Sequence, residues 1–174
     1  MRRASVPIVL VAFACGGGTN APPAPPPEPF IAFSSDFGNF RTWESFALTY
    51  SVPGNDHLSG PRTVFLRARP PAGAKAFPVG TMIVKESGDG DLPSRHVFAM
   101  VKRGGGFNAD GAAGWEWFEL QNVDDADVAL IWRGLGPTNG DAYGSATTGG
   151  CNGCHSAGKV SDYVFSPPLA KLIE

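Results

Sequence analysis

Hydrophobic and aromatic residues follow two different spacings before and after Pro61. Between residues 36 and 50 they recur near helical spacing, and Asp36 is a suitable residue to cap the start of a helix. The residues with this spacing are Phe37, Phe40, Trp43, Phe46 and Leu48. The pattern therefore predicts one amphipathic helix in this part of the chain.

After Pro61 the chain has short stretches rich in β-branched and aromatic residues, each bounded by Gly, Pro or Asp. Such stretches are typical of strands, and the short intervals between them favour antiparallel neighbours over helical crossovers. The stretches are residues 62–67, 80–86, 96–102, 115–121 and 128–133. We therefore expect a mainly β (α+β) fold with a five-stranded antiparallel sheet.

The core of this sheet is expected to contain large aromatic side chains, namely Trp115, Trp117, Trp132 and Phe118. No cofactor is needed to explain these residues, because aromatic side chains commonly fill sheet cores. Residues 162–173 are also rich in apolar positions, but Pro167 and Pro168 interrupt any helix there. We expect short C-terminal helices, the last of them beyond Pro168.

The amino terminus has the three parts of an export signal. Basic Arg2 and Arg3 precede an apolar stretch, residues 6–13, and small Ala14 stands before Cys15. The apolar stretch is too short to span a bilayer. Ordinary signal cleavage and lipoprotein processing would both cut after Ala14. Residues 1–14 are therefore the expected signal peptide, and the protein is expected in the periplasm or as an outer-membrane-anchored lipoprotein.

Residues 15–29 are composed mainly of Gly, Ala and Pro and include the proline-rich run 21–27. This composition favours polyproline geometry and predicts a semi-rigid tether. A lipid at Cys15 would anchor the protein to a membrane without spanning it. Residues 30–174 are long enough for one domain with a hydrophobic core.

Charge and motif content exclude several classes of function. The formal net charge is −2, and the fourteen Lys and Arg residues are scattered along the chain. The sequence therefore shows no basic stripe of the kind that binds nucleic acid. It also lacks a phosphate loop, a dinucleotide fingerprint and the Gly-x-Ser-x-Gly motif of hydrolases.

The strongest chemical signal is the run Cys151-Asn152-Gly153-Cys154-His155. It is a complete C-x-x-C-H motif, which is typical of covalent haem attachment. Two thiols at this spacing add to the two vinyl groups of one haem, and the next residue becomes the axial ligand of the iron. We expect one haem c, held by Cys151 and Cys154 and ligated by His155.

Three other interpretations of the motif remain. A disulfide between Cys151 and Cys154 would close a very small loop and leave His155 without a role. A zinc site would need further ligands, and the remaining histidines are His57 and His96. A thioredoxin-like redox pair is expected next to a βαβ pattern, which the strand spacing does not indicate.

Several short segments, in their order along the chain, resemble the cytochrome P-460 family and its relatives, the cytochromes c′-β. The segments are Phe40-Arg41-Thr42-Trp43, Arg62-Thr63-Val64, Gly80-Thr81-Met82-Ile83-Val84-Lys85-Glu86, Val101-Lys102, Gly114-Trp115, the haem motif and Asp162-Tyr163-Val164-Phe165. The likeness covers residues 36–173. It implies a mostly β cytochrome, usually a homodimer in the family, which acts on small molecules such as hydroxylamine, nitric oxide or carbon monoxide.

The resemblance assigns roles to Lys85 and Arg62. Lys85 matches a lysine that is cross-linked to the porphyrin in the hydroxylamine-oxidising members. It would share a strand face with Thr81 and Ile83, although a lysine at a strand end usually has its ammonium in water. Arg62 matches an arginine of the distal pocket, where a guanidinium would hold a polar nitrogen species. The alternative for Arg62 is a rim residue paired with a surface acid.

Phe98 and Met100 bear on the choice of function. The hydroxylamine-oxidising members carry a carboxylate where this chain has Phe98, and a phenyl ring cannot relay protons. Phe98 instead resembles the aromatic caps of the c′-β branch, or it fills the core. Met100 would ligate iron in an electron carrier, although buried methionines usually serve packing.

Three functions follow from these residues. The first is a haem oxidoreductase for hydroxylamine or nitric oxide, with a five-coordinate iron and a distal pocket that contains Arg62, Lys85 and Phe98. The second is a protein that binds or senses nitric oxide or carbon monoxide without turnover. The third is a periplasmic electron carrier, whose redox partner the sequence does not identify. His57 and His96 are assigned no catalytic role.

Overall fold

The computed structural model describes residues 25–49, 60–137, 143–144 and 150–174. The expected signal peptide, Cys15, most of the tether and His57 lie outside the described residues. Phe30 donates its backbone N–H to the carbonyl of Arg103 at 2.9 Å, close to the expected start of the domain. None of the helices in the described part of the chain has the length and apolar character needed to cross a membrane.

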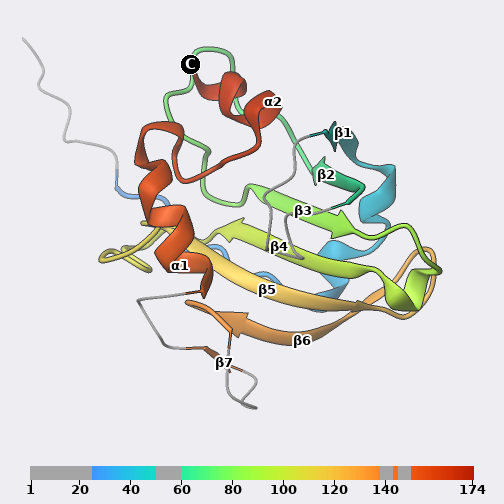
Figure 1. Ribbon diagram of the computed structural model, residues 1–174. Helices are drawn as coiled ribbons and strands as arrows, with labels where there is room; N and C mark the ends of the chain where they lie inside the picture. The colour runs from blue at the N-terminus through green and yellow to red at the C-terminus, as the bar shows by residue number, and fades with distance from the viewer. Residues whose placement is uncertain (1–24, 50–59, 138–142, 145–149) are drawn as a thin grey trace, which may run out of the picture.

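The fold is mainly β and is built on one sheet whose strands lie side by side in chain order (Figure 1). Six strands pair antiparallel with their neighbours: β1 (Glu44–Leu48), β2 (Arg62–Leu66), β3 (Met82–Ser87), β4 (His96–Lys102), β5 (Trp115–Asn122) and β6 (Val128–Gly134). The two-residue strand β7 (Tyr143–Gly144) pairs with β6 in parallel. All five predicted strands are present, but the prediction of five strands missed β1 and the short strand β7.

The amphipathic helix predicted between residues 36 and 50 was wrong. Two short 3-10 turns, η1 (Ser34–Phe37) and η2 (Phe40–Thr42), are followed by strand β1. Asn39, with φ of 55°, separates the turns, and extended Trp43 leads into the strand. Phe37 and Phe40 pack in one hydrophobic cluster, whereas Leu48 belongs to another. The apparent helical spacing therefore combined residues of separate elements that serve two cores.

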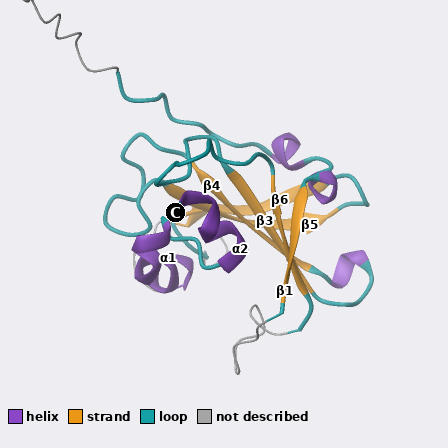
Figure 2. Cartoon of the chain, turned by 90° about the horizontal axis from the view of Figure 1, so that it is seen from above, coloured by secondary structure: helices purple, strands orange, loops and turns teal. Residues whose placement is uncertain are grey.

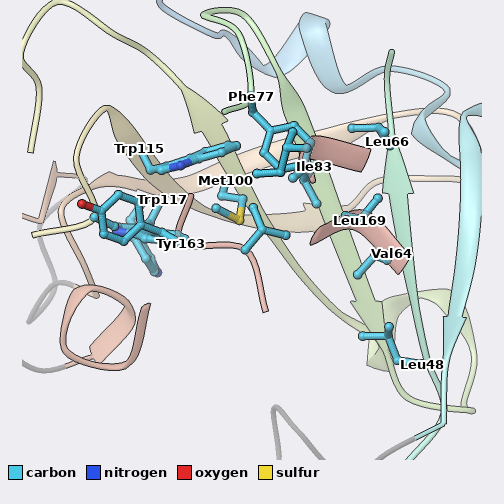
Figure 3. Packing of buried hydrophobic residues seen from close by; sticks show 14 residues of the cluster. Leu48, Val64, Leu66, Phe77, Ile83, Met100, Trp115, Trp117, Tyr163 and Leu169 are labelled. Atoms are coloured by element: carbon cyan, nitrogen blue, oxygen red, sulfur yellow. The ribbon is translucent and has the colours of Figure 1, made fainter. Parts of the chain in front are cut away.

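The two clusters lie on opposite faces of the sheet because side chains alternate along a strand. We name the face covered by residues 150–174 the C-terminal face and the other the N-terminal face. Buried sheet residues of the C-terminal face are Leu48, Val64, Leu66, Ile83, Met100, Trp115, Trp117 and Trp132 (Figure 3). Those of the N-terminal face are Phe65, Met82, Val84, Val97, Ala99, Val101, Phe118, Leu120 and Val128. Phe118 is thus buried as expected, but on the opposite face from the three tryptophans.

Short helices follow the sheet and cover its C-terminal face (Figures 1 and 2). They are α1 (Gly150–His155), η5 (Ser156–Ser161), α2 (Pro167–Ala170) and η6 (Lys171–Ile173), and a further turn, η4 (Leu92–Ser94), precedes β4. Helix α2 begins at Pro167 rather than beyond Pro168. Proline is tolerated in a first helical turn, because the N–H it lacks has no intrahelical partner there.

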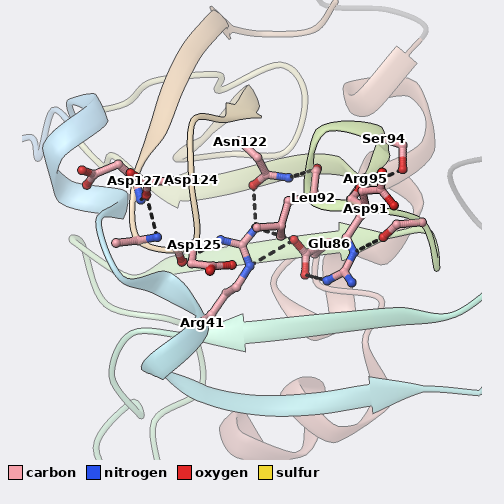
Figure 4. Close-up of polar contacts among 12 residues, drawn as sticks. Arg41, Glu86, Asp91, Leu92, Ser94, Arg95, Asn122, Asp124, Asp125 and Asp127 are labelled. Carbon is pink, nitrogen blue, oxygen red and sulfur yellow. Dashed lines mark hydrogen bonds and ion pairs between the residues drawn. The ribbon is translucent and has the colours of Figure 1, made fainter.

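A polar network on the N-terminal face ties η2 to the sheet (Figure 4). Arg41 donates to Glu86 from Nη2 at 2.5 Å and from Nε at 3.2 Å, and it also donates to Asn122 at 2.5 Å. Arg95 approaches the second carboxylate oxygen of Glu86 at 3.4 Å. These charged groups satisfy one another, so their role on this face is structural.

Candidate functional site

Helix α1 presents the two predicted haem-binding cysteines to the C-terminal face. Cys151 and Cys154 are three residues apart, which places them on the same side of a helix. Both are free thiols. Cys151 is half-buried and packs against the cluster of the C-terminal face, whereas Cys154 is exposed. Two thiols on one side of a helix can both reach a single flat group bound beside it.

The orientation of His155 leaves one ring nitrogen available for a metal. Its Nδ1 lies 2.7 Å from the backbone carbonyl of Tyr163 and donates a hydrogen bond to it. The imidazole packs between two aromatic rings, with centroid distances of 4.5 Å to Trp117 and 5.1 Å to Phe165. A proton on Nδ1 leaves a lone pair on Nε2, which is the usual state of a metal-ligating histidine.

A strained turn places the carbonyl of Tyr163 against His155. Asp162 and Tyr163 have φ values of 48° and 67°, a left-handed conformation that costs non-glycine residues roughly 1–3 kcal/mol each. Lys102 holds the Asp162 carboxylate at 2.6 Å, and Trp115 Nε1 donates to the Asp162 carbonyl at 2.8 Å. The Asp162 carboxylate also accepts the backbone N–H of Phe77. The sheet thus holds the turn that orients the imidazole.

Asn152, inside the cysteine motif, fastens α1 to the sheet. Its side chain is fully buried. Asn152 Oδ1 accepts from Trp117 Nε1 at 3.0 Å and from Asn108 Nδ2 at 2.7 Å, and Asn152 Nδ2 donates back to Asn108 at 2.9 Å. A Cβ at Gly111 would lie 2.8 Å from Asn152 Nδ2, so only glycine leaves room for this contact. Trp117 therefore contacts both Asn152 and the ring of His155.

The predicted distal residues lie on the same face as α1. Arg62 is only 3% exposed, so it is not a rim residue. Lys85 is directly opposite Val64 on one side and Phe98 on the other. Ile83 and Lys85 share the C-terminal face, as the alternation predicted, while Met82 and Val84 pack on the N-terminal face. Arg62, Lys85 and Phe98 therefore belong to one face that also receives Cys151.

Electrostatic coupling also places Lys85 near the cysteine helix. Burial lowers the pKa of Lys85, and the charge of Arg62 lowers it further. Burial raises the pKa of Cys151 to about 11, against the opposing effect of the Lys85 charge. Burial lowers the pKa of His155; the bond to Tyr163 opposes this, and the charge of Lys85 adds to it. The environment therefore favours a neutral imidazole.

Phe98 and Met100 take different positions on strand β4. Phe98 is half-buried; the Lys85 ammonium lies 5.6 Å from its ring centroid, and His96 stacks on it at 6.4 Å. Met100 is buried in the core cluster, in the neighbourhood of Trp115 and Trp117 (Figure 3). Its packing there satisfies the structural role expected of a buried methionine.

Sequence reasoning missed the residues that position the motif. Asn152 fastens α1 through its hydrogen bonds to Asn108 and Trp117, and we call these contacts the lock. The sequence indicated only a core role for Trp117. Glu119 was also missed; it lies opposite Phe98 and its charge acts on Cys151. The segment beginning at Asp162 carries part of the family resemblance. Its role in orienting His155 depends on the left-handed turn at Asp162 and Tyr163, which the sequence did not indicate.

The donor set fits a covalently attached haem better than a bare metal ion. Within the described ranges, no group of three or more His, Cys, Asp or Glu side chains is arranged to hold a metal. A haem needs no such group, because the porphyrin supplies four nitrogen ligands and the protein adds an axial one. Two free thiols on one helix side and an imidazole with its Nε2 lone pair match that requirement.

A separate cavity of about 500 Å³ lies among other residues, including Phe30, Arg67, Arg69, Pro78 and Thr81. Its arginines are engaged within the protein: Arg69 pairs with Glu44, and Arg67 lies 3.8 Å from Asp36. We assign this cavity no part in the site.

Comparisons of the chain with protein-family models, with curated proteins and with solved structures find no match. The resemblance to the cytochrome P-460 group therefore rests on the short motifs and stays a prediction. The geometry around Cys151, Cys154 and His155 is independent of that resemblance.

Replacing Asn152 by Ala is expected to lower the free energy of unfolding by about 2–3 kcal/mol, because Trp117 Nε1 and the Asn108 amide lose buried partners. Urea denaturation of the purified wild-type protein and of the Asn152→Ala variant measures the difference in free energy of unfolding. Gly153→Ala is the matched control, because a Cβ at Gly153 meets nothing within 4 Å. Equal losses in both variants would show that Asn152 does not fasten the helix.

In the reduced, haem-free chain, Cys154 is expected to react with iodoacetamide about tenfold faster than Cys151, or more, near pH 8. Cys154 is exposed, whereas burial raises the pKa of Cys151 to about 11 and so reduces its thiolate fraction. Mass spectrometry of peptides from timed reactions gives both rates. The rates should converge in concentrated urea; equal rates without urea would contradict the burial of Cys151.

Proposed function

We propose that this chain is an exported, mono-haem c-type cytochrome that acts on hydroxylamine or nitric oxide. Cys151 and Cys154 would carry the haem, and His155 Nε2 would be the axial ligand of a five-coordinate iron. The observation that carries the proposal is the hydrogen bond from His155 Nδ1 to the Tyr163 carbonyl, next to two free thiols on one helix side. Export, with a lipid at Cys15 as a membrane anchor, is part of the proposal.

Attachment needs no oxidant. Each cysteine S–H would add across one vinyl C=C bond of the haem, so that a C–S bond would form at one carbon and the hydrogen would go to the other. Asn152, held by Asn108 and Trp117, would keep both thiols against the C-terminal face. The bound group would supply an iron centre for ligand binding and electron transfer.

The chain's own residues would control what reaches that centre. Arg62 is a buried permanent cation with several donors, which suits a small polar nitrogen compound. Lys85 adds a second cationic group whose pKa is lowered by burial. Trp117 and Phe165 flank the imidazole and limit its contact with water. The arrangement supports chemistry on a small ligand rather than on a large substrate.

A second candidate function is binding of nitric oxide or carbon monoxide without turnover. Its supporting observation is the half-buried ring of Phe98, on the same face as Lys85. An aromatic side chain there favours small apolar diatomic gases and cannot accept a proton. Steady-state assays separate the two functions, because rapid reduction of an added acceptor by hydroxylamine requires turnover. A low-spin six-coordinate resting spectrum would instead favour an electron carrier with Met100 on iron.

Protein matured with a haem-attachment system is expected to show the pyridine haemochrome spectrum of a haem with two thioether bonds. Cys151→Ala and Cys154→Ala should each shift the α band to longer wavelength, because one vinyl group stays unsaturated. The double variant should lose covalent haem in denaturing gels. A colourless wild-type protein produced beside a correctly matured control cytochrome would contradict the proposal.

The cross-link at Lys85 stays a prediction that rests on the family resemblance. It would replace one N–H and one ring C–H by an N–C bond, which releases two electrons and two protons, so a two-electron oxidant such as a peroxide is required. After peroxide treatment, tryptic mapping of the haem-loaded protein should lose the peptide that ends at Lys85. The Lys85→Arg variant should keep the equivalent peptide, and full recovery from both proteins would contradict the cross-link.

A further inference from the structure

Three buried tryptophans of the C-terminal face differ in the group that accepts their indole N–H. Two of them donate to neutral oxygens, Trp115 to the Asp162 carbonyl at 2.8 Å and Trp117 to the Asn152 amide at 3.0 Å. Trp132 Nε1 instead donates to a carboxylate oxygen, Glu119 Oε2, at 2.5 Å. Among these three indoles, Trp132 is therefore the one whose hydrogen-bond partner can also take up a proton.

Strand pairing holds Trp132 and Glu119 together, because they lie directly opposite each other on β6 and β5. Trp132 is 5% exposed, and Glu119 is half-buried. A hydrogen bond to an ionised acceptor is roughly twice as strong as one between neutral groups, so the contact stabilises the sheet. The same contact gives Trp132 a chemical property that Trp115 and Trp117 lack.

Loss of one electron turns an indole N–H into a strong acid. Beside a neutral oxygen, the oxidised ring keeps its proton and stays a buried cation, which costs free energy. At Trp132 the N–H bond would break and an O–H bond would form at Glu119 Oε2. The products would be a neutral indole radical and a neutral carboxylic acid, so no charge would stay buried at the pair. Glu119 therefore makes Trp132 the easiest of the three tryptophans to oxidise.

A second aromatic ring lies between Trp132 and the candidate haem site. The ring centroid of Trp117 is 4.5 Å from that of the His155 imidazole. Trp117 and Glu119 are two residues apart on β5, and Trp132 is opposite Glu119, so the two indoles are diagonal neighbours on one face. Diagonal positions are about 7–8 Å apart, within reach of aromatic side chains, and both residues belong to the same buried cluster. The two indoles thus form a short aromatic route from His155 to Glu119.

We propose that Trp132 and Glu119 form a redox-active pair, in which Trp132 gives one electron to an oxidant and its Nε1 proton passes to Glu119. The source of the oxidant rests on the proposed function. A peroxide would take two electrons from the haem centre and two protons from water, its O–O bond would break, and it would leave as water. Trp132 would replace one of these electrons through Trp117. Oxidising equivalents would thereby settle away from His155, which protects the axial ligand from damage.

Azidyl radicals, made by pulse radiolysis of azide in aerated solution, test the pair in the full-length chain without haem. Each azidyl radical takes one electron and becomes azide, and tryptophan radicals end as oxygenated tryptophan. The three tryptophans lie in one tryptic peptide, residues 104–133, whose fragment ions separate them. They are similarly buried, at 0%, 4% and 5% exposure, so access to solvent does not favour one of them. Trp132 is expected to carry most of the oxygenation in this peptide.

Glu119→Gln keeps an acceptor oxygen for Trp132 but cannot take up its proton. It should lower the oxygenated share at Trp132 about tenfold or more, because a positioned proton acceptor typically contributes about 10²–10⁴ in rate. Glu174→Gln is the control, because it removes an exposed carboxylate at the chain end and should leave the share unchanged.

The outcomes separate the pair from the haem proposal. Oxygenation that is concentrated at Trp132 in the wild type and falls there in Glu119→Gln supports the pair. A wild-type share at Trp132 no larger than that at Trp117, or an equal share in Glu119→Gln, overturns it. In the haem-loaded protein, peroxide without a reductant should also oxygenate Trp132, and its absence there would overturn the protective role. A chain that passes the azidyl test but stays colourless after maturation would refute the haem proposal alone.

Discussion

The candidate site depends on the docking of the C-terminal segment against one face of the sheet. Apolar contacts contribute to this docking, but buried hydrogen bonds decide its position, because they can form in only one placement of α1 on the sheet. Asn152 exchanges hydrogen bonds with Asn108 and accepts one from Trp117. Since an unmatched buried amide is costly, a shift of α1 along the sheet would lose these bonds and gain nothing in return. The lock therefore fixes the position of the cysteines more strictly than hydrophobic contact would.

The candidate site and the buried Glu116 ion pairs lie on opposite faces of the sheet. On the N-terminal face, charged groups are matched: Glu116, fully buried, accepts from Arg133 at 2.7 Å and 2.8 Å and lies 3.3 Å from Arg103. On the C-terminal face, Lys85 brings positive charge near Cys151 and the imidazole of His155. Strand alternation keeps the two faces apart. Because of this separation, Lys85 can gain or lose its proton without disturbing the ion pairs of Glu116 on the N-terminal face.

Much of the sheet could be predicted from the sequence, because each of the five expected strands has its own run of β-branched and aromatic residues between turn residues. Strand β1 could not, since Phe37, Phe40, Phe46 and Leu48 imitate a helix although they serve two different cores. The cysteine motif was visible as a short contiguous pattern. The groups that orient it were not, because Asn108, Trp117 and Asp162 reach it only through strand register and a left-handed turn.

The burial of Cys151 has a consequence for how the proposed attachment would proceed. A thiol with a pKa raised to about 11 is a poor nucleophile in the closed fold, and Asn152 holds helix α1 in this position. Cys154 is exposed, so burial does not hinder its reaction. Full attachment would therefore require either local release of α1 or addition at Cys151 before the C-terminal segment docks. The hydrogen bonds of the lock join residues far apart in sequence, so they are absent from an unfolded chain, in which both thiols are accessible. Attachment before docking therefore avoids the free-energy cost of breaking these bonds.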